Sequence, residues 1–188
     1  ARPTKDAIWI ATGKASPLDA KGKNQPIHTS YCRTRYVAIE QLRSQLLRLQ
    51  QEQQRVFVGF DFSFGYPEGL TKALELDAAP AWLAIWTELY QQIEDAPTNE
   101  NNRFQLAADF NRRMKAERGP FWGVTQGQDS IHLGARKDFD FPVKAGLDGS
   151  LAEKRLVETR HTGLQSSWKL AYTGSVGSQS LLGIPYLY

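Results

Sequence analysis

The sequence predicts an α/β fold in which a mixed sheet is flanked by helices, and three observations support this prediction. Residues 55–61 form a near-continuous apolar run, dense enough for a buried strand, that ends on a carboxylate. Apolar residues directly before this run recur at helical spacing. Short segments that are expected to be extended precede this helix and follow the apolar run. Strands of consecutive apolar residues are covered on both faces, as in parallel or mixed sheets. All-α and all-β folds are therefore not expected.

The first third of the chain predicts a hairpin followed by a helix. Residues 6–11 and 26–32 are expected to be neighbouring strands, joined by a loop rich in Gly, Lys and Pro that runs through residue 25. From Thr34 onward the apolar stripe of a helix follows. Its members are Ile39, Leu42, Leu46 and Leu49. We expect this helix to lead into a central strand at residues 55–61.

The rest of the chain is expected to belong to the same single domain, residues 1–188. Residues 67–118 read as a helical insertion of two or three helices, with turns at Pro80 and residues 97–99. The aromatic residues on their apolar stripes, such as Trp86 and Tyr90, are expected in the core rather than as a platform for bases. Residues 119–152 show no sustained period and predict a long irregular loop, either a functional lid or simply a mobile segment.

Composition limits the classes of protein. Of the 188 residues, 41% are hydrophobic and 23% charged, and no apolar run approaches the roughly 20 residues that span a bilayer, so no membrane insertion is expected. Cys32 is the only cysteine, which excludes an internal disulfide and fits a cytoplasmic location. The net charge of +3 is too small to indicate a dedicated nucleic-acid binder, although a local basic patch is not excluded.

The carboxylate at the end of the apolar run is the main candidate for chemistry. Ligands of open α/β sheets lie beyond the carboxyl ends of the strands, so Asp61 is expected at the mouth of a cleft, with Ser63 two residues further on. The competing interpretation is that Asp61 only hydrogen-bonds backbone amides in the turn at Gly65 and Pro67.

A second group of candidates lies near the C-terminus. Residues 155–160 are predicted to form a short strand that carries Glu158, and beside the Asp61 strand the two carboxylates would suit Mg²⁺ or Mn²⁺. The alternative is an ion pair of Glu158 with Arg160 or Lys169. The segment after Lys169 contains two glycines among serines that would expose backbone amides to an anion, or that simply form a turn. Its candidate contacts are Gly174, Ser175 and Gly177.

Five blocks of the sequence carry a resemblance to a known group of proteins. They are residues 6–11, 58–67, 121–123 and 158–160, and a fifth block near the C-terminus that comprises residues 167–170 and 174–185. Together they resemble an uncharacterised bacterial family that is similar to predicted nucleases with a ribonuclease-H-like fold. The resemblance implies a mixed sheet flanked by helices, with acidic residues from separate strands holding a divalent metal. Asp61 is the residue that matches this pattern best, and Glu158 matches it less well.

Proteins of the resembled group carry one strand with a metal-binding acidic residue before the segment that begins here at Asp6, and another after residues 183–185. Because this sequence contains neither, we expect an apparently truncated chain with an incomplete metal site. The chain begins with Ala, which suggests a processed or trimmed start. Three function classes follow. One is a metal-dependent phosphoryl-transfer enzyme, most simply a nuclease or other hydrolase. Another is an enzyme that binds a nucleotide or a phosphorylated small molecule, and the third is a noncatalytic binding domain.

Overall fold

A computed structural model describes residues 8–14, 26–76, 79–116, 118–146 and 149–188. The chain divides into two compact units, each described here by itself. Unit 1 comprises Ala1–Gly59 with Asp95–Asn101, and unit 2 comprises Phe60–Glu94 with Asn102–Tyr188. Whether the chain behaves as one domain stays a prediction. None of the described helices is both long and apolar enough to cross a membrane.

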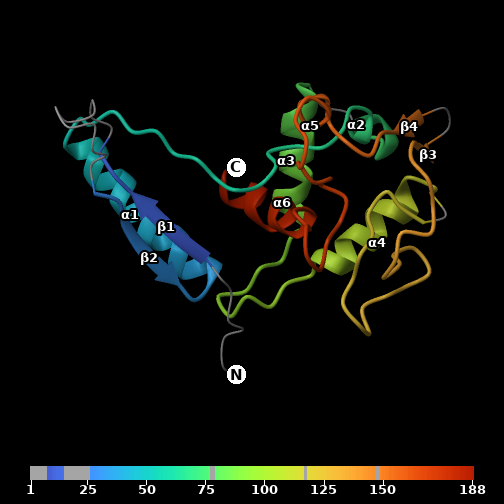
Figure 1. Ribbon diagram of the computed structural model, residues 1–188, viewed down its shortest axis with the longest axis horizontal. Coiled ribbons are helices and arrows are strands. Elements are labelled where there is room, and N and C mark those ends of the chain that lie inside the picture. Colours follow the sequence, from blue (N-terminus) through green and yellow to red (C-terminus); the bar gives the residue numbers. More distant parts are fainter. Residues whose placement is uncertain (1–7, 15–25, 77–78, 117, 147–148) are drawn as a thin grey trace. The chain divides into compact units, whose positions relative to one another are not determined.

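Unit 1 contains the predicted hairpin and helix. Strands β1 (Ile8–Thr12) and β2 (His28–Cys32) pair antiparallel, with Ile8 opposite Cys32 and Thr12 opposite His28. The predicted hairpin is thus confirmed for its described residues, whereas residues 6–7 and the loop at 15–25 lie outside them. Helix α1 (Arg35–Gln51) lies along the hairpin (Figure 1).

Helix α1 begins directly after Thr34, which is its N-cap. The Thr34 side chain accepts a hydrogen bond from the Val37 backbone amide at 3.2 Å, which satisfies one of the unpaired amides of the first turn. The predicted stripe from Ile39 to Leu49 is half-buried, while Arg43 and Arg48 are exposed. No residue of α1 is fully buried. The predicted helix is therefore confirmed, but the apolar side chains of this stripe are only half-buried by the described part of unit 1.

Ion pairing attaches residues 95–101 to the start of α1. The Arg35 side chain donates to both carboxylate oxygens of Asp95, at 2.6 and 2.7 Å. The Asn99 side chain accepts from the Arg35 backbone amide at 2.9 Å and donates to the Arg33 carbonyl at 3.2 Å. These contacts join residues 60 to 66 positions apart in the sequence, and residues 95–101 belong to unit 1.

The predicted central strand is wrong. Residues 55–60 form no strand, and Val56, Phe57 and Val58 are exposed. The prediction failed because an apolar run becomes a strand only where a neighbouring strand supplies hydrogen bonds and packing. Among the described residues, β1 and β2 pair only with each other.

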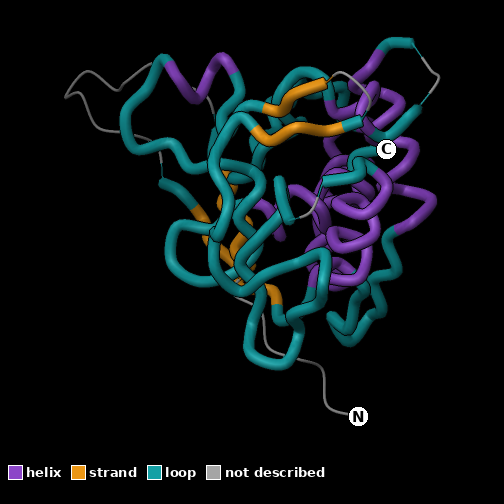
Figure 2. Tube along the Cα trace, turned by 90° about the vertical axis from the view of Figure 1, so that its right-hand side faces the viewer, coloured by secondary structure: helices purple, strands orange, loops and turns teal. Residues whose placement is uncertain are grey.

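Unit 2 holds most of the helices, as the sequence predicted for residues 67–118. They are α2 (Leu70–Ala73), α3 (Ala81–Gln92) and α4 (Arg103–Arg113), followed after a long irregular stretch by α5 (Leu156–Thr159), α6 (Gly177–Gly183) and the 3₁₀ turn η1 (Ile184–Tyr186). Strands β3 (Val143–Ala145) and β4 (Gly149–Leu151) pair antiparallel near the end of the predicted loop. Loops and turns make up much of the trace (Figure 2).

The core of unit 2 is rich in aromatic residues. Trp168, Phe110 and Phe121 are its largest fully buried side chains. Two blocks that the sequence singled out meet here, because Trp122 and Lys169 form a parallel bridge in which the Trp122 amide donates to the Trp168 carbonyl at 3.1 Å. The sequence predicts Trp86 and Tyr90 in the core. Trp86 does pack against it, whereas Tyr90 is 55% exposed, so this prediction is confirmed in part.

The fold therefore combines helices with small antiparallel sheets. This agrees with the prediction that both kinds of element occur, and each sheet formed by the described residues has two strands.

Candidate functional site

The candidate site lies in unit 2, where the segment that follows Phe60 meets helix α5. The Glu158 carboxylate is 2% exposed and binds the Arg155 guanidinium, with 2.9 Å between Arg155 Nε and Glu158 Oε1. The Ser63 hydroxyl donates to Glu158 Oε1 at 3.4 Å and accepts from Arg155 Nη2 at 3.0 Å. Ser63, Arg155 and Glu158 thus form one hydrogen-bonded network, here called the Ser63 network, that joins segments more than 90 residues apart.

The local structure at Glu158 differs from the predicted strand. Residues Leu156–Thr159 are the helical turn α5, with Arg155 as its N-cap. Glu158 Oε2 accepts a hydrogen bond from the Arg155 backbone amide at 2.7 Å, as the Glu of a capping box does. A side chain that binds the backbone of its own turn favours a helix start over a strand, so the strand prediction was wrong.

The ionic partner of Glu158 is also different from the residues considered. The carboxylate pairs with Arg155 rather than with Arg160 or Lys169. Arg160 is exposed at the end of α5. The Lys169 ammonium donates to the Thr173 carbonyl at 2.6 Å and lies 5.4 Å from the centre of the Trp122 ring. Neither cation has a described contact with the Ser63 network.

Aromatic side chains hold the segment that carries Asp61 and Ser63. The rings of Phe60, Phe62 and Phe64 contact one another, with centroids 5.5 to 6.2 Å apart. The Trp86 indole donates to the Phe64 carbonyl at 2.8 Å. A Cβ added at Gly183 would lie 2.5 Å from the Phe62 ring, so this glycine allows the close approach of α6. Ser63 is half-buried as a result, and Asp61 remains exposed.

Tyr66 packs behind the Ser63 network. Its ring lies 5.1 Å from that of Trp168 and 5.7 Å from that of Phe121. Its hydroxyl is buried and has no hydrogen-bond partner among the described residues. Burial raises the pKa of the Tyr66 phenol, and the positive charge of Arg155 offsets only part of that rise. The phenol is therefore neutral at physiological pH, beside a guanidinium.

The glycine and serine segment after Lys169 uses two of its amides within the chain. The Ser175 amide donates to the Tyr172 carbonyl at 3.1 Å, and the Gly177 amide donates to the Lys169 carbonyl at 2.9 Å. A Cβ added at Gly177 would lie 2.5 Å from the Ser167 carbonyl oxygen, so close backbone packing requires glycine there. Gly174 has a positive φ of 75° and forms part of a turn. An anion at Ser175 or Gly177 would have to replace these hydrogen bonds.

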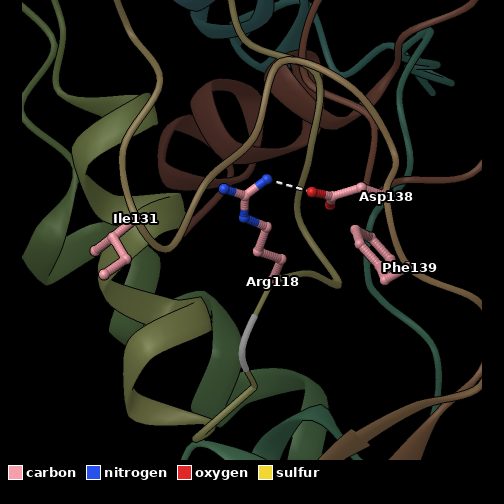
Figure 3. A pocket seen from close by; sticks show the side chains of 4 residues that line it. All are labelled: Arg118, Ile131, Asp138 and Phe139. Atoms are coloured by element: carbon pink, nitrogen blue, oxygen red, sulfur yellow. Dashed lines mark hydrogen bonds and ion pairs between the residues drawn. The ribbon is translucent and has the colours of Figure 1, made fainter.

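A cavity of about 420 Å³ lies elsewhere in unit 2 (Figure 3). Arg118, Ile131, Asp138 and Phe139 line it, and Arg118 points toward Asp138, with which it forms an ion pair. The two charges neutralise each other and both side chains are partly exposed. Because none of its lining residues belongs to the Ser63 network, this cavity is separate from the candidate site.

The predicted metal ligands are unevenly suited to a cation. Both oxygens of Glu158 accept hydrogen bonds from Arg155, and the guanidinium at 2.9 Å both satisfies this carboxylate and repels a metal ion. Asp61 is exposed and accessible. The described residues contain no group of three or more His, Cys, Asp or Glu side chains that could hold an ion. In this arrangement Glu158 does not fit Mg²⁺ or Mn²⁺, and Asp61 is the carboxylate that remains for one.

Sequence reasoning missed Arg155 and Tyr66. Arg155 lies three residues before Glu158, which is the spacing of a capping interaction and of a helical ion pair, so this signal was available. Tyr66 falls within the block around Asp61 but offered no pattern of its own. The arrangement as a whole provides a hydroxyl, a guanidinium held by a buried carboxylate, and an exposed carboxylate two residues from the hydroxyl.

Comparison of the chain with protein-family models, with curated proteins and with solved structures found no match.

Proposed function

We propose that this protein is a phosphoryl-transfer enzyme, most simply a nuclease of ribonuclease-H-like type, whose substrate phosphate binds at the Ser63 network. The proposal rests on the side of the Arg155 guanidinium that binds no described residue. Its Nε and Nη2 atoms are held by Glu158 and Ser63, its Nη1 atom has no partner among the described residues, and its side chain is 25% exposed. A guanidinium that is oriented but still accessible is suited to a phosphate oxygen.

The other groups have distinct roles in this proposal. Arg155 binds and neutralises the phosphate, and the Ser63 hydroxyl turns from Glu158 to donate its hydrogen bond to a second phosphate oxygen. Glu158 is a positioning residue, because it fixes the guanidinium and lies 2% exposed beneath it. Asp61 is the group that would accept a proton from the attacking water or hold a divalent ion. We expect metal binding to be weak, since one carboxylate leaves most of the coordination sphere to water.

The substrate class is nucleic acid or a phosphorylated small molecule. A panel of single- and double-stranded DNA, RNA, and nucleoside mono- and diphosphates, each with Mg²⁺ or Mn²⁺, tests both. Arg155→Lys keeps the charge but removes the planar fork, and should lower kcat/KM by about 100-fold. Asp61→Asn should abolish metal-dependent turnover. Arg43→Gln removes an exposed charge from α1 and is the matched control.

Binding provides a second readout that does not depend on turnover. Titration with inorganic phosphate and with nucleotides should show affinity that Arg155→Lys weakens and Arg43→Gln leaves unchanged. Binding without turnover would identify a noncatalytic binding domain or require a different substrate chemistry. Turnover that survives both Asp61→Asn and Arg155→Lys would show that the site lies elsewhere in the chain.

A further inference from the structure

The run of apolar residues after α1 is the most exposed hydrophobic segment of the described chain. Phe57 is 96% exposed, and Val56 and Val58 are 46% and 38% exposed. Residues 55–60 are neither helix nor strand, and their backbone groups make no hydrogen bond to any described residue. Figure 1 draws this segment, in teal after α1, as an extended trace.

The composition of this segment is typical of a β-strand, although it pairs with no strand of the described chain. Val and Phe are strong strand formers, and residues 56–60 contain no charge and no proline. An exposed apolar segment with unpaired backbone groups is a template for pairing with another chain. These exposed groups are left to water in one copy of the chain, and a partner strand would pair them and cover the apolar side chains.

The order of the side chains favours a second copy of the same segment as that partner. In an antiparallel pair centred on Val58, Arg55 of each copy lies opposite Asp61 of the other, so that two pairs of opposite charges flank the apolar residues. Val56 then faces Phe60, and Phe57 faces Gly59, where an aromatic ring covers a residue without a side chain. A parallel pair in register would instead place like charges opposite each other, which is destabilising.

We propose that two copies of this chain associate through residues 55–61, which pair as antiparallel strands about a two-fold axis at Val58. The interface is isologous, because each copy presents the same segment to the other. The proposal does not depend on the proposed function, since it rests on exposure, unpaired backbone groups and charge order.

The size of this interface makes the dimer weak. Phe57 contributes about 200 Å² of buried surface on each copy, and one pair of strands remains below the roughly 1,000 Å² of a stable interface. The dimer should therefore form and dissociate with protein concentration. Its dissociation constant should lie in the micromolar range or above.

A reciprocal exchange of charges tests both the pairing and its direction. Sedimentation velocity over a concentration series should show a monomer–dimer equilibrium for the native chain. Arg55→Asp places a second carboxylate opposite Asp61 at both ends of the interface, and Asp61→Arg places a second guanidinium opposite Arg55. Each single substitution should raise the dissociation constant about tenfold or more, and the double exchange should restore it.

Two further variants separate this interface from general hydrophobic association. Phe57→Ser should yield a monomer, whereas Ile131→Ser, at a side chain 78% exposed in unit 2, should leave the dimer intact. Circular dichroism checks that each variant is folded. A native chain that stays monomeric up to about 1 mM would refute the proposal. A charge exchange that fails to restore association would also refute it, as would a monomer whose residues 55–60 resist amide hydrogen exchange, because that protection would indicate pairing within one chain.

Discussion

Replacing Glu158 by Gln tests the ion pair at the centre of the candidate site. The carboxylate is 2% exposed and accepts hydrogen bonds from Arg155 at 2.7 and 2.9 Å and from Ser63 at 3.4 Å. Glu158→Gln removes the charge but keeps the shape and an oxygen for the backbone amide of Arg155. The guanidinium is then left without its counter-charge in a largely buried position.

The magnitude follows from the burial of the two partners. Removing one partner of a buried ion pair costs about 3–5 kcal/mol. Water can solvate part of the Arg155 side chain, which is 25% exposed, and Gln preserves one hydrogen bond. We therefore expect Glu158→Gln to lower the free energy of unfolding by about 2–3 kcal/mol.

Urea denaturation of four proteins measures this value: the native chain, Glu158→Gln, Arg155→Met and the double variant. The coupling energy between the two residues should be about 1–2 kcal/mol, with the double variant less destabilised than the sum of the single ones. An unchanged slope m would show that the unfolded state is comparable in all four. A coupling energy near zero would refute the reasoning, because it would mean that the two side chains do not interact in solution.

Two further predictions concern buried polar groups. Tyr66→Phe should raise the free energy of unfolding by about 1 kcal/mol at neutral pH, because it removes a buried hydroxyl that has no described partner. Burial raises the pKa of this phenol in the folded state above the value near 10 of an unfolded chain. The folded state therefore keeps its full stability below pH 10 and loses stability as the pH rises above 10, because the unfolded chain ionises this phenol first. Tyr66→Phe should reduce this loss of stability at alkaline pH. Tyr90→Phe, at an exposed ring, is the control and should leave the loss unchanged. A destabilised Tyr66→Phe would instead reveal a hydrogen-bond partner for the hydroxyl. Asn111→Ala should lower the free energy of unfolding by about 3 kcal/mol, since the fully buried Asn111 amide bonds the Phe121 backbone at 2.9 and 3.1 Å and the His132 carbonyl at 2.7 Å. The melting temperature should fall by about 6–12 °C, and a fall of less than 2 °C would contradict this role.

Local pattern was sufficient for the elements that depend on near neighbours. The short extended segments at residues 6–11 and 26–32 predicted the β1–β2 hairpin, and the helical spacing from Thr34 onward predicted α1. The helices between Pro67 and Gly119 were also anticipated, because helix periodicity and turn residues are properties of the sequence over a few positions.

The candidate site could be predicted only in part. Ser63 and Glu158 were both identified, and they hydrogen-bond to each other and to Arg155, which was not. The residue that joins them contacts Ser63 across 92 positions of the chain, a distance over which no local pattern carries information.

The sequence by itself determined where the hairpin, α1 and the helices between Pro67 and Gly119 form, since each follows from residue patterns within a short stretch of the chain. Tertiary structure decided another point. Residues 55–61 have the composition of a central strand and yet form none, because a strand requires a partner that the described residues do not supply. Residues 156–159 have the composition of a strand and form a helical turn, because Glu158 binds the backbone and guanidinium of Arg155 three residues earlier, whereas only the tertiary structure brings Ser63 to this pair. In both cases the outcome depended on which hydrogen-bond partners lay within reach.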